Sequence, residues 1–112
     1  MPISITTVEE RKRDWRSDYE VTGGGERLVQ NGLMEGYSMG HGTARVRIEV
    51  GQTINLGRLD PERKFESVRF SCAVELPVPN TPEQVLEGLA ISKALAEEEV
   101  NAYVAALEEG LG

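Results

Sequence analysis

Two stretches of the chain alternate between apolar and polar residues, and this period of two constrains the fold more than any other feature. In 43–57 the apolar residues stand at even positions: Ala44, Val46, Ile48, Val50, Ile54 and Leu56. In 66–78 they again stand at even positions: Val68, Phe70, Cys72, Val74 and Leu76. Successive side chains of a strand point to opposite faces, so each stretch predicts a strand with one buried and one open face. We interpret the connection, 58–65, as a loop, so the two strands should pair antiparallel.

The open phase of the first predicted strand changes character along its length. It begins with the charged residues Arg45, Arg47 and Glu49. It then continues with small and polar residues: Gly51, Thr53, Asn55 and Gly57. Such residues allow another backbone or a flat ligand to approach closely, but they are equally typical of a twisted or bulged strand end.

A long helix is predicted at the C-terminal end, over 81–109. Thr81 suits the N-cap, Pro82 the first helical position and Gln84 the capping-box position. An apolar stripe follows at spacings of three, four or seven: Val85, Leu89, Ala96, Val100, Tyr103 and Leu107. A continuous helix of this length spans about 40 Å, whereas a strand of eight residues spans only about 27 Å. The far end of the stripe should therefore need another partner, either the Gly-rich N-terminal hairpin or a second copy of the chain, and of these we favour a homodimer.

The N-terminal segment, 1–42, has weaker signals. Thr7 and Glu10 match a capping box, which predicts a short helix. The run TGGGE at 22–26 predicts a loop, and Asn31-Gly32 between apolar residues predicts a hairpin turn. We therefore expect one α+β domain: an N-terminal helix and Gly-rich hairpin (1–42), a central β-hairpin (43–77) in an antiparallel sheet, and a long C-terminal helix (81–109) packed on one face.

Composition limits the functional classes. A chain of 112 residues has room for one modest core. The single cysteine, Cys72, excludes an internal disulfide and fits a reducing compartment. It stands in the apolar phase, so we expect it in the core. The longest apolar run is far shorter than a bilayer, and no signal-like segment opens the chain, so we expect a cytoplasmic protein without a membrane partner.

Catalysis and metal binding have little support in the sequence. The chain has one histidine, His41, and one cysteine, which cannot form a standard structural zinc set. No nucleophile-elbow pattern and no phosphate-loop spacing is present. We expect a protein without enzymatic activity, cofactor or metal. An enzyme remains the alternative, with His41 as its one plausible proton-transfer group.

The net charge of −7 is unevenly distributed. Residues 1–69 hold 11 acidic and 11 basic residues, and residues 70–112 hold 8 acidic residues and one base. On the neutral part, candidate nucleic-acid contacts lie on the open strand faces or in the connecting loop: Arg45, Arg47, Arg58, Lys64 and Arg69. Tyr37, Trp15 and Tyr19 could stack on the bases of a single strand. The plain alternative is a charge-balanced sheet face on which Glu49, Glu62 and Glu66 pair with these arginines.

The acidic helix suggests a second kind of partner. Glu97, Glu98 and Glu99 are consecutive, so neighbouring carboxylates diverge by about 100° and cannot converge as a catalytic pair. They form either a solvated face or, with Tyr103 and Leu107, a surface for a basic host or phage protein. An inhibitor of a host nucleic-acid enzyme would carry such a surface.

One stretch also resembles a known kind of protein. The run "RIEVGQTINLGRLDPERKFESVRFSCAVELP" is similar to a VGxTINLGxxES strand and turn, followed by a VRxxVxxELP-like strand and an acidic helix. This pattern occurs in small phage and prophage proteins, most of them of unknown function. The resemblance covers roughly 46–77, and the connection in 58–65 is longer than in the pattern. It implies a phage-type origin and a non-enzymatic role in nucleic-acid processing or host takeover, and it carries no catalytic residues.

Overall fold

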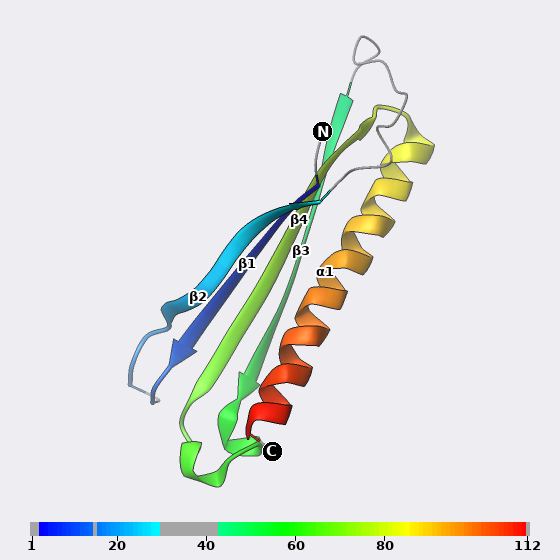
Figure 1. Ribbon diagram of the computed structural model, residues 1–112. Coiled ribbons are helices and arrows are strands. Elements are labelled where there is room, and N and C mark those ends of the chain that lie inside the picture. Colours follow the sequence, from blue (N-terminus) through cyan, green and yellow to red (C-terminus); the bar gives the residue numbers. More distant parts are fainter. Residues whose placement is uncertain (1–2, 15, 30–42, 112) are drawn as a thin grey trace.

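The computed structural model describes residues 3–14, 16–29 and 43–111. Its main elements are four strands and one helix: β1 (Ile3–Lys12), β2 (Glu20–Val29), β3 (Thr43–Asn55), β4 (Ser67–Pro79) and α1 (Pro82–Leu111). The strands form one antiparallel sheet in the order β2-β1-β4-β3. The helix lies along one face of this sheet (Figure 1). The predicted α+β class, with a long C-terminal helix on one face of an antiparallel sheet, is confirmed.

The two alternating stretches form the predicted antiparallel pair. β3 and β4 align over their full length, with Val50 opposite Cys72. The apolar phase of β4 is buried, and Cys72 lies in the core with no exposed surface. β3 ends at Asn55, two residues before the end of the alternating stretch, and a 3₁₀ turn, η3 (Leu56–Arg58), follows. The Asn55 side chain accepts a hydrogen bond from the amide of Gly57 and so turns the chain out of the strand.

The predicted N-terminal helix is wrong, because this segment forms β1 at an interior position of the sheet. β1 pairs with β2 on one side and with β4 on the other. Ile3 and Ile5 are buried in the core. Thr7 and Glu10 therefore do not form a capping box. Bonding to two neighbouring strands satisfies more backbone groups than an isolated short helix can.

The glycine run at 22–26 is also not a loop, because it lies inside β2. β2 is an edge strand, and all its residues except Val29 are exposed. A bulge between Glu9 and Glu10 shifts its register with β1, and Gly24 has a φ of 132°. The glycines therefore allow an irregular strand. The hairpin turn predicted at Asn31-Gly32 lies outside the described residues.

The helix begins as predicted. The Thr81 hydroxyl accepts a hydrogen bond from the amide of Gln84 at 3.3 Å and donates one to the Gln84 side chain at 2.9 Å. The helix ends at Leu111, two residues beyond the predicted end, so Gly110 lies in its last turn. The helix contacts β3 and β4, and the half of the sheet formed by β1 and β2 extends to one side of it (Figure 1).

The helix does not extend beyond the sheet, contrary to the length argument from the sequence. β3 and β4 have 13 residues each rather than about eight, so each spans about 43 Å, close to the 45 Å of a 30-residue helix. The stripe therefore packs against the core of the sheet from Val85 near one end to Tyr103 near the other. The molecule is an elongated body of 57 × 25 × 21 Å.

Candidate functional site

The sheet has two different faces. One packs under α1, and no described element covers the other (Figure 1). The register places Arg45, Arg47 and Arg69 on this open face, as predicted from their phase. We call this surface the open face, and its two parts differ in their charge pattern.

Along β3 and the middle of β4, the open face is charge-balanced. Arg45 pairs with Glu75 on the neighbouring strand. Arg47 lies 3.2 Å from Glu49 on the same strand. Of the glutamates that the plain alternative named, Glu49 pairs here with Arg47, whereas the partner of Arg45 is Glu75, which it did not name. Glutamates neutralise the arginines here.

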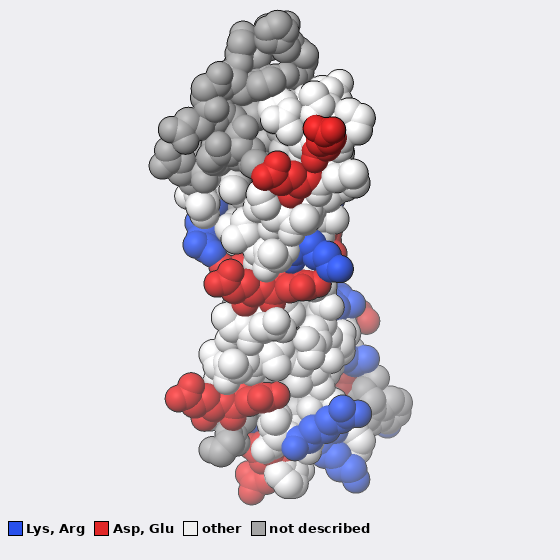
Figure 2. Space-filling model, turned by 90° about the vertical axis from the view of Figure 1, so that its right-hand side faces the viewer, with Lys and Arg blue, Asp and Glu red and all other residues white. Residues whose placement is uncertain are grey.

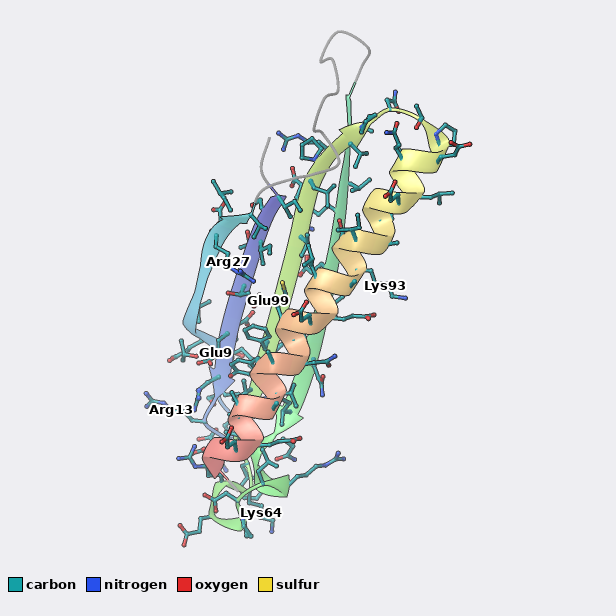
Figure 3. The ribbon with its side chains drawn as sticks, turned by 45° about the vertical axis from the view of Figure 1, so that its right-hand side comes forward. Glu9, Arg13, Arg27, Lys64, Lys93 and Glu99 are labelled. Atoms are coloured by element: carbon teal, nitrogen blue, oxygen red, sulfur yellow. The ribbon has the colours of Figure 1, made fainter. Side chains whose placement is uncertain are left out.

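The end of the sheet near the β3–β4 connection has a different charge pattern. Four basic side chains there form no ion pair with another described residue: Lys12, Arg13, Arg58 and Lys64. We call this group the basic end. Figure 3 shows Arg13 beyond the end of β1 and Lys64 on the β3–β4 connection, at the same end of the molecule. Lys12 and Arg13 come from the segment that the sequence predicted as a helix, so their place beside Arg58 and Lys64 was not predicted.

Two acidic side chains at this end pair with Arg63, which is not a member of the basic end. Arg63, in the second 3₁₀ turn η4 (Pro61–Arg63), lies 3.6 Å from Asp60 and 3.8 Å from Glu66. The Asp60 side chain also caps η4 by accepting the amide of Glu62 at 3.0 Å. These contacts hold the connection in a defined shape and leave Arg58 and Lys64 without an acidic partner among the described residues.

A hollow of about 590 Å³ opens at the basic end. Its lining includes three cations of this group, Lys12, Arg58 and Lys64, and the carboxylates of Glu66 and Glu108. It also includes the rings of Tyr19 and Phe65, and Phe65 is 56% exposed. A second hollow of about 370 Å³ adjoins it through Lys12, Glu66 and Ser67 and includes Arg13. The concave surface is therefore lined by cations and aromatic residues, and also by two glutamates.

Tyr19 is fixed on the open face beside this hollow. Its hydroxyl shares a hydrogen bond of 2.9 Å with the hydroxyl of Ser67. The Arg69 guanidinium lies 4.2 Å from the centre of the Tyr19 ring, and the Lys12 ammonium lies 5.8 Å from it. Arg69 also donates a 2.6 Å hydrogen bond to Glu10, which raises the pKa of Arg69 above its ordinary value. Arg69 therefore holds the Tyr19 ring in place and keeps its charge.

The helix side contains a separate polar contact. The Tyr103 ring stacks on Phe70 with centroids 4.0 Å apart, and its hydroxyl donates a 2.6 Å hydrogen bond to Glu9. This hydrogen bond is the largest cause of the lowered pKa of Glu9. Burial, followed by the same bond, raises the pKa of Tyr103 to about 12. Tyr103, expected at a partner surface, is thus engaged within the chain.

The other expected partner contacts fall into two groups. Glu99 forms an ion pair with Arg27 of β2, and Leu107 is half-buried. Glu97 and Glu98 are exposed, and Glu97 lies 3.9 Å from Lys93. Figure 2, which looks onto the helix, shows acidic side chains in separate groups along it.

Some candidates lie outside the described residues, namely Trp15, Tyr37 and His41. Within the described ranges, no three His, Cys, Asp or Glu side chains gather so that they could hold a metal ion. The helix described here lacks the combination of length and apolar character needed to cross a membrane.

No family model, no curated protein and no solved structure matches the chain significantly.

Proposed function

We propose that this protein is a non-enzymatic binding protein that takes up single-stranded nucleic acid at its basic end. The observation that carries the proposal is the 590 Å³ hollow, whose lining brings together three cations that form no ion pair with another described residue, two aromatic residues, and the glutamates Glu66 and Glu108. This combination of phosphate-binding charge and stacking surface is typical of proteins that bind single strands without sequence preference. The resemblance to phage proteins is compatible with this role.

Each part of the basic end has a role in the proposal. Lys12, Arg58 and Lys64 neutralise backbone phosphates, which releases counterions and makes binding depend on salt. Phe65, which is 56% exposed, offers a ring face to a base. Arg69 and Tyr19 form a preformed stack that borders the hollow. The rest of the open face, where Arg45 and Arg47 pair with glutamates, contributes less than the sequence suggested.

The test is fluorescence anisotropy of a labelled single-stranded oligonucleotide and its duplex across a salt series. The variant Lys12→Gln with Lys64→Gln removes two positive charges from the basic end. We expect its log–log salt slope to fall by about 1.4, at roughly 0.7 for each lost phosphate contact. No binding of the wild-type protein at low salt would refute the proposal.

A matched control separates the local effect from net charge. Lys93→Glu changes the net charge by the same two units on the exposed surface of α1, away from the basic end (Figure 3). We expect it to keep the wild-type slope. Phe65→Ala should weaken single-strand binding by about tenfold, because stacking of one base contributes about 1–3 kcal/mol. If Lys93→Glu lowered the salt slope as much as Lys12→Gln with Lys64→Gln does, binding would depend on net charge and not on a local site.

A second candidate function is supported by the outer surface of α1. Six exposed acidic residues lie there, with one base, Lys93. They are Glu83, Glu87, Glu97, Glu98, Glu108 and Glu109. This surface suits a basic protein partner. Of the three consecutive glutamates, Glu99 already pairs with Arg27, so Glu97 and Glu98 are the two proposed to contact the basic partner.

Charge reversal tests this second candidate. Glu97→Lys with Glu98→Lys should remove proteins that co-purify with the wild-type chain. Glu26→Lys with Glu62→Lys, at exposed positions on β2 and on the β3–β4 connection, makes the same change in net charge elsewhere. Identical pull-downs from all three proteins would exclude the acidic surface as the contact.

A further inference from the structure

The sheet has two outer edges with opposite properties. β2 forms one edge, and its bulge, glycine run and positive φ at Gly24 make it irregular. β3 forms the other edge, and its register with β4 runs from Thr43 to Asn55 without a shift. Among the described residues, no strand pairs with the outer edge of β3. Long, regular edge strands are templates for pairing with another chain, and irregularity is a common means of preventing it.

The side chains of β3 fit a second copy of the same strand. In an antiparallel pair related by a two-fold axis perpendicular to the sheet, directly opposed residues point to the same face. If Ile48 faces Ile48 across the axis, Arg47 of each copy lies opposite Glu49 of the other. Both side chains are more than half exposed, at 56% and 54%, and so are accessible for this contact. Opposite charges directly across a strand pair stabilise it.

The same register also matches apolar residues on the helix side. There, Val46 of one copy lies opposite Val50 of the other, and Ile48 lies on the axis. Ile48 and Val50 are only partly buried within the chain, at the margin of the core. Pairing would cover this margin and extend the core across the axis. β2 offers no equivalent, because Arg27 and Glu26 lie in opposite phases and cannot face each other across such an axis.

The position of α1 permits this arrangement. The helix contacts both β3 and β4, so it lies over the half of the sheet that ends in the β3 edge. Two copies joined along β3 would therefore place their helices on the same face, one on each side of the two-fold axis. Lys93 points from the helix on the side opposite Glu99 (Figure 3). Leu86, two turns earlier on the same side, is 66% exposed and would gain a neighbour.

From these observations we propose that the protein forms a homodimer through antiparallel pairing of β3 with β3, with Ile48 on the two-fold axis. The interface joins two four-stranded sheets into one of eight strands. It differs from the helix-end dimer expected from the sequence, because Tyr103 is already engaged with Phe70 and Glu9. The proposal does not rest on nucleic-acid binding, since none of the four cations of the basic end lies on β3, although Gln52 and Thr53 of β3 line the adjoining hollow.

Charge swaps test the register, with light scattering after size exclusion as the measurement. The wild type should have twice the chain mass of 12.3 kDa. Arg47→Glu and Glu49→Arg each place like charges opposite each other, and each should weaken the dimer at least tenfold. The double variant restores opposite charges and should restore the dimer.

The control for the swaps is Arg45→Glu, which makes the same charge change on the same face. Arg45 would lie opposite Gly51 of the second copy, so this variant should remain dimeric. A monomeric wild type at 100 µM, a concentration chosen to be about a hundredfold above a micromolar dissociation constant, would overturn the proposal. Equal masses for the wild type and both single variants would also overturn it. Oligonucleotide binding, measured on the same proteins, should change little and so tests the other proposal separately.

Crosslinking provides a second measurement that does not depend on charge. The native Cys72 is fully buried and gives little background. Ile48→Cys would bring two cysteines together across the axis, where paired strands place Cα atoms about 4.5–5.5 Å apart, within disulfide range. We expect a covalent dimer on mild oxidation. Thr6→Cys, exposed on β1, should not form one at the same rate. Equal rates would overturn the register.

Discussion

Gly88 lies in the second turn of α1, where its backbone faces β3 and β4 closely. A Cβ atom at this position would lie 2.6 Å from Cγ1 of Val78 and 3.2 Å from Cγ2 of Val46. Val78 is fully buried and cannot move aside freely. Glycine in the middle of a helix normally costs about 1 kcal/mol relative to alanine. Here the absence of a side chain allows the helix to approach the sheet.

We therefore predict that Gly88→Ala destabilises the protein, although the same change stabilises most exposed helices. Overpacking should lower the free energy of unfolding by about 1–3 kcal/mol. Urea denaturation followed by circular dichroism measures this. Gly110→Ala, in the last turn of α1 with no atom within 4 Å of the new methyl group, is the control and should be neutral or stabilising. Stabilisation by both changes would contradict the close contact.

The hydrogen bond between Tyr103 and Glu9 predicts a pH-dependent stability. The pKa of Glu9 is lowered, so the stability it contributes is present above its ordinary pKa of 4.5 and is lost as the pH falls through the lowered value. The pKa of Tyr103 is raised to about 12, so its contribution is present below the ordinary pKa of 10.0 and is lost as the pH rises toward 12. Tyr103→Phe should therefore lower the free energy of unfolding by about 1 kcal/mol at neutral pH. The difference in the free energy of unfolding between Tyr103→Phe and the wild type should shrink as the pH falls below 4.5 and as it rises above 10.0. A difference that stays the same in both ranges would show that the hydrogen bond to Glu9 does not cause it.

At the scale of the elements, the sequence predicted those whose signals are local. β3, β4 and α1 each carry a long periodic pattern, and the Thr81 cap has the expected partner. β1 was predicted incorrectly because its deciding contacts are distant in sequence. Glu10 bonds to Arg69, 59 residues away, and Glu9 bonds to Tyr103, 94 residues away. The alternation of Ile3, Ser4, Ile5 and Thr6 was the one local signal for a strand.

The residues of the candidate site divide in the same way, into those that local patterns identified and those that only strand pairing brings in. Arg58 and Lys64 were identified because the loop between two clear strands was identified. Lys12 and Arg13 join them only because β1 runs antiparallel beside β4, with Lys12 opposite Ser67. Tyr19 was named as a stacking residue, but its contact with Arg69 depends on the same pairing. A site built by pairing of distant strands cannot be assembled from local patterns alone.

Gly24 provides a prediction for the pairing of β1 with β2. Its φ of 132° is rarely adopted by other residues, and a Cβ atom there would lie 2.3 Å from the carbonyl oxygen of Thr7. Gly24→Ala should therefore weaken the pairing of β2 with β1. A local cost of about 1.4 kcal/mol corresponds to roughly tenfold faster hydrogen exchange of the backbone amides in both strands. Gly25→Ala, where a methyl group meets no atom within 4 Å, is the matched control. Equal exchange in the two variants would show that β2 tolerates a side chain at either position.

At the scale of the whole molecule, shape distinguishes the proposed dimer from other dimers. The chain has a radius of gyration of 17.4 Å, although a compact chain of this length has one of about 13 Å. Its long extent of 57 Å follows the strands, which set the length of the sheet. Ile48 is one residue from the middle of β3, so two copies joined there lie side by side with little offset.

We therefore predict that small-angle scattering of the dimer shows a maximum dimension only slightly greater than that of the monomeric Arg47→Glu variant. One of the two short extents, 25 and 21 Å, roughly doubles, while the long extent of 57 Å stays nearly the same. A dimer joined at the basic ends or at the opposite ends would instead approach twice 57 Å. The maximum dimension of the wild-type dimer thus shows whether the two copies lie side by side or end to end. An end-to-end dimension would place the contact away from β3, even if the mass were that of a dimer.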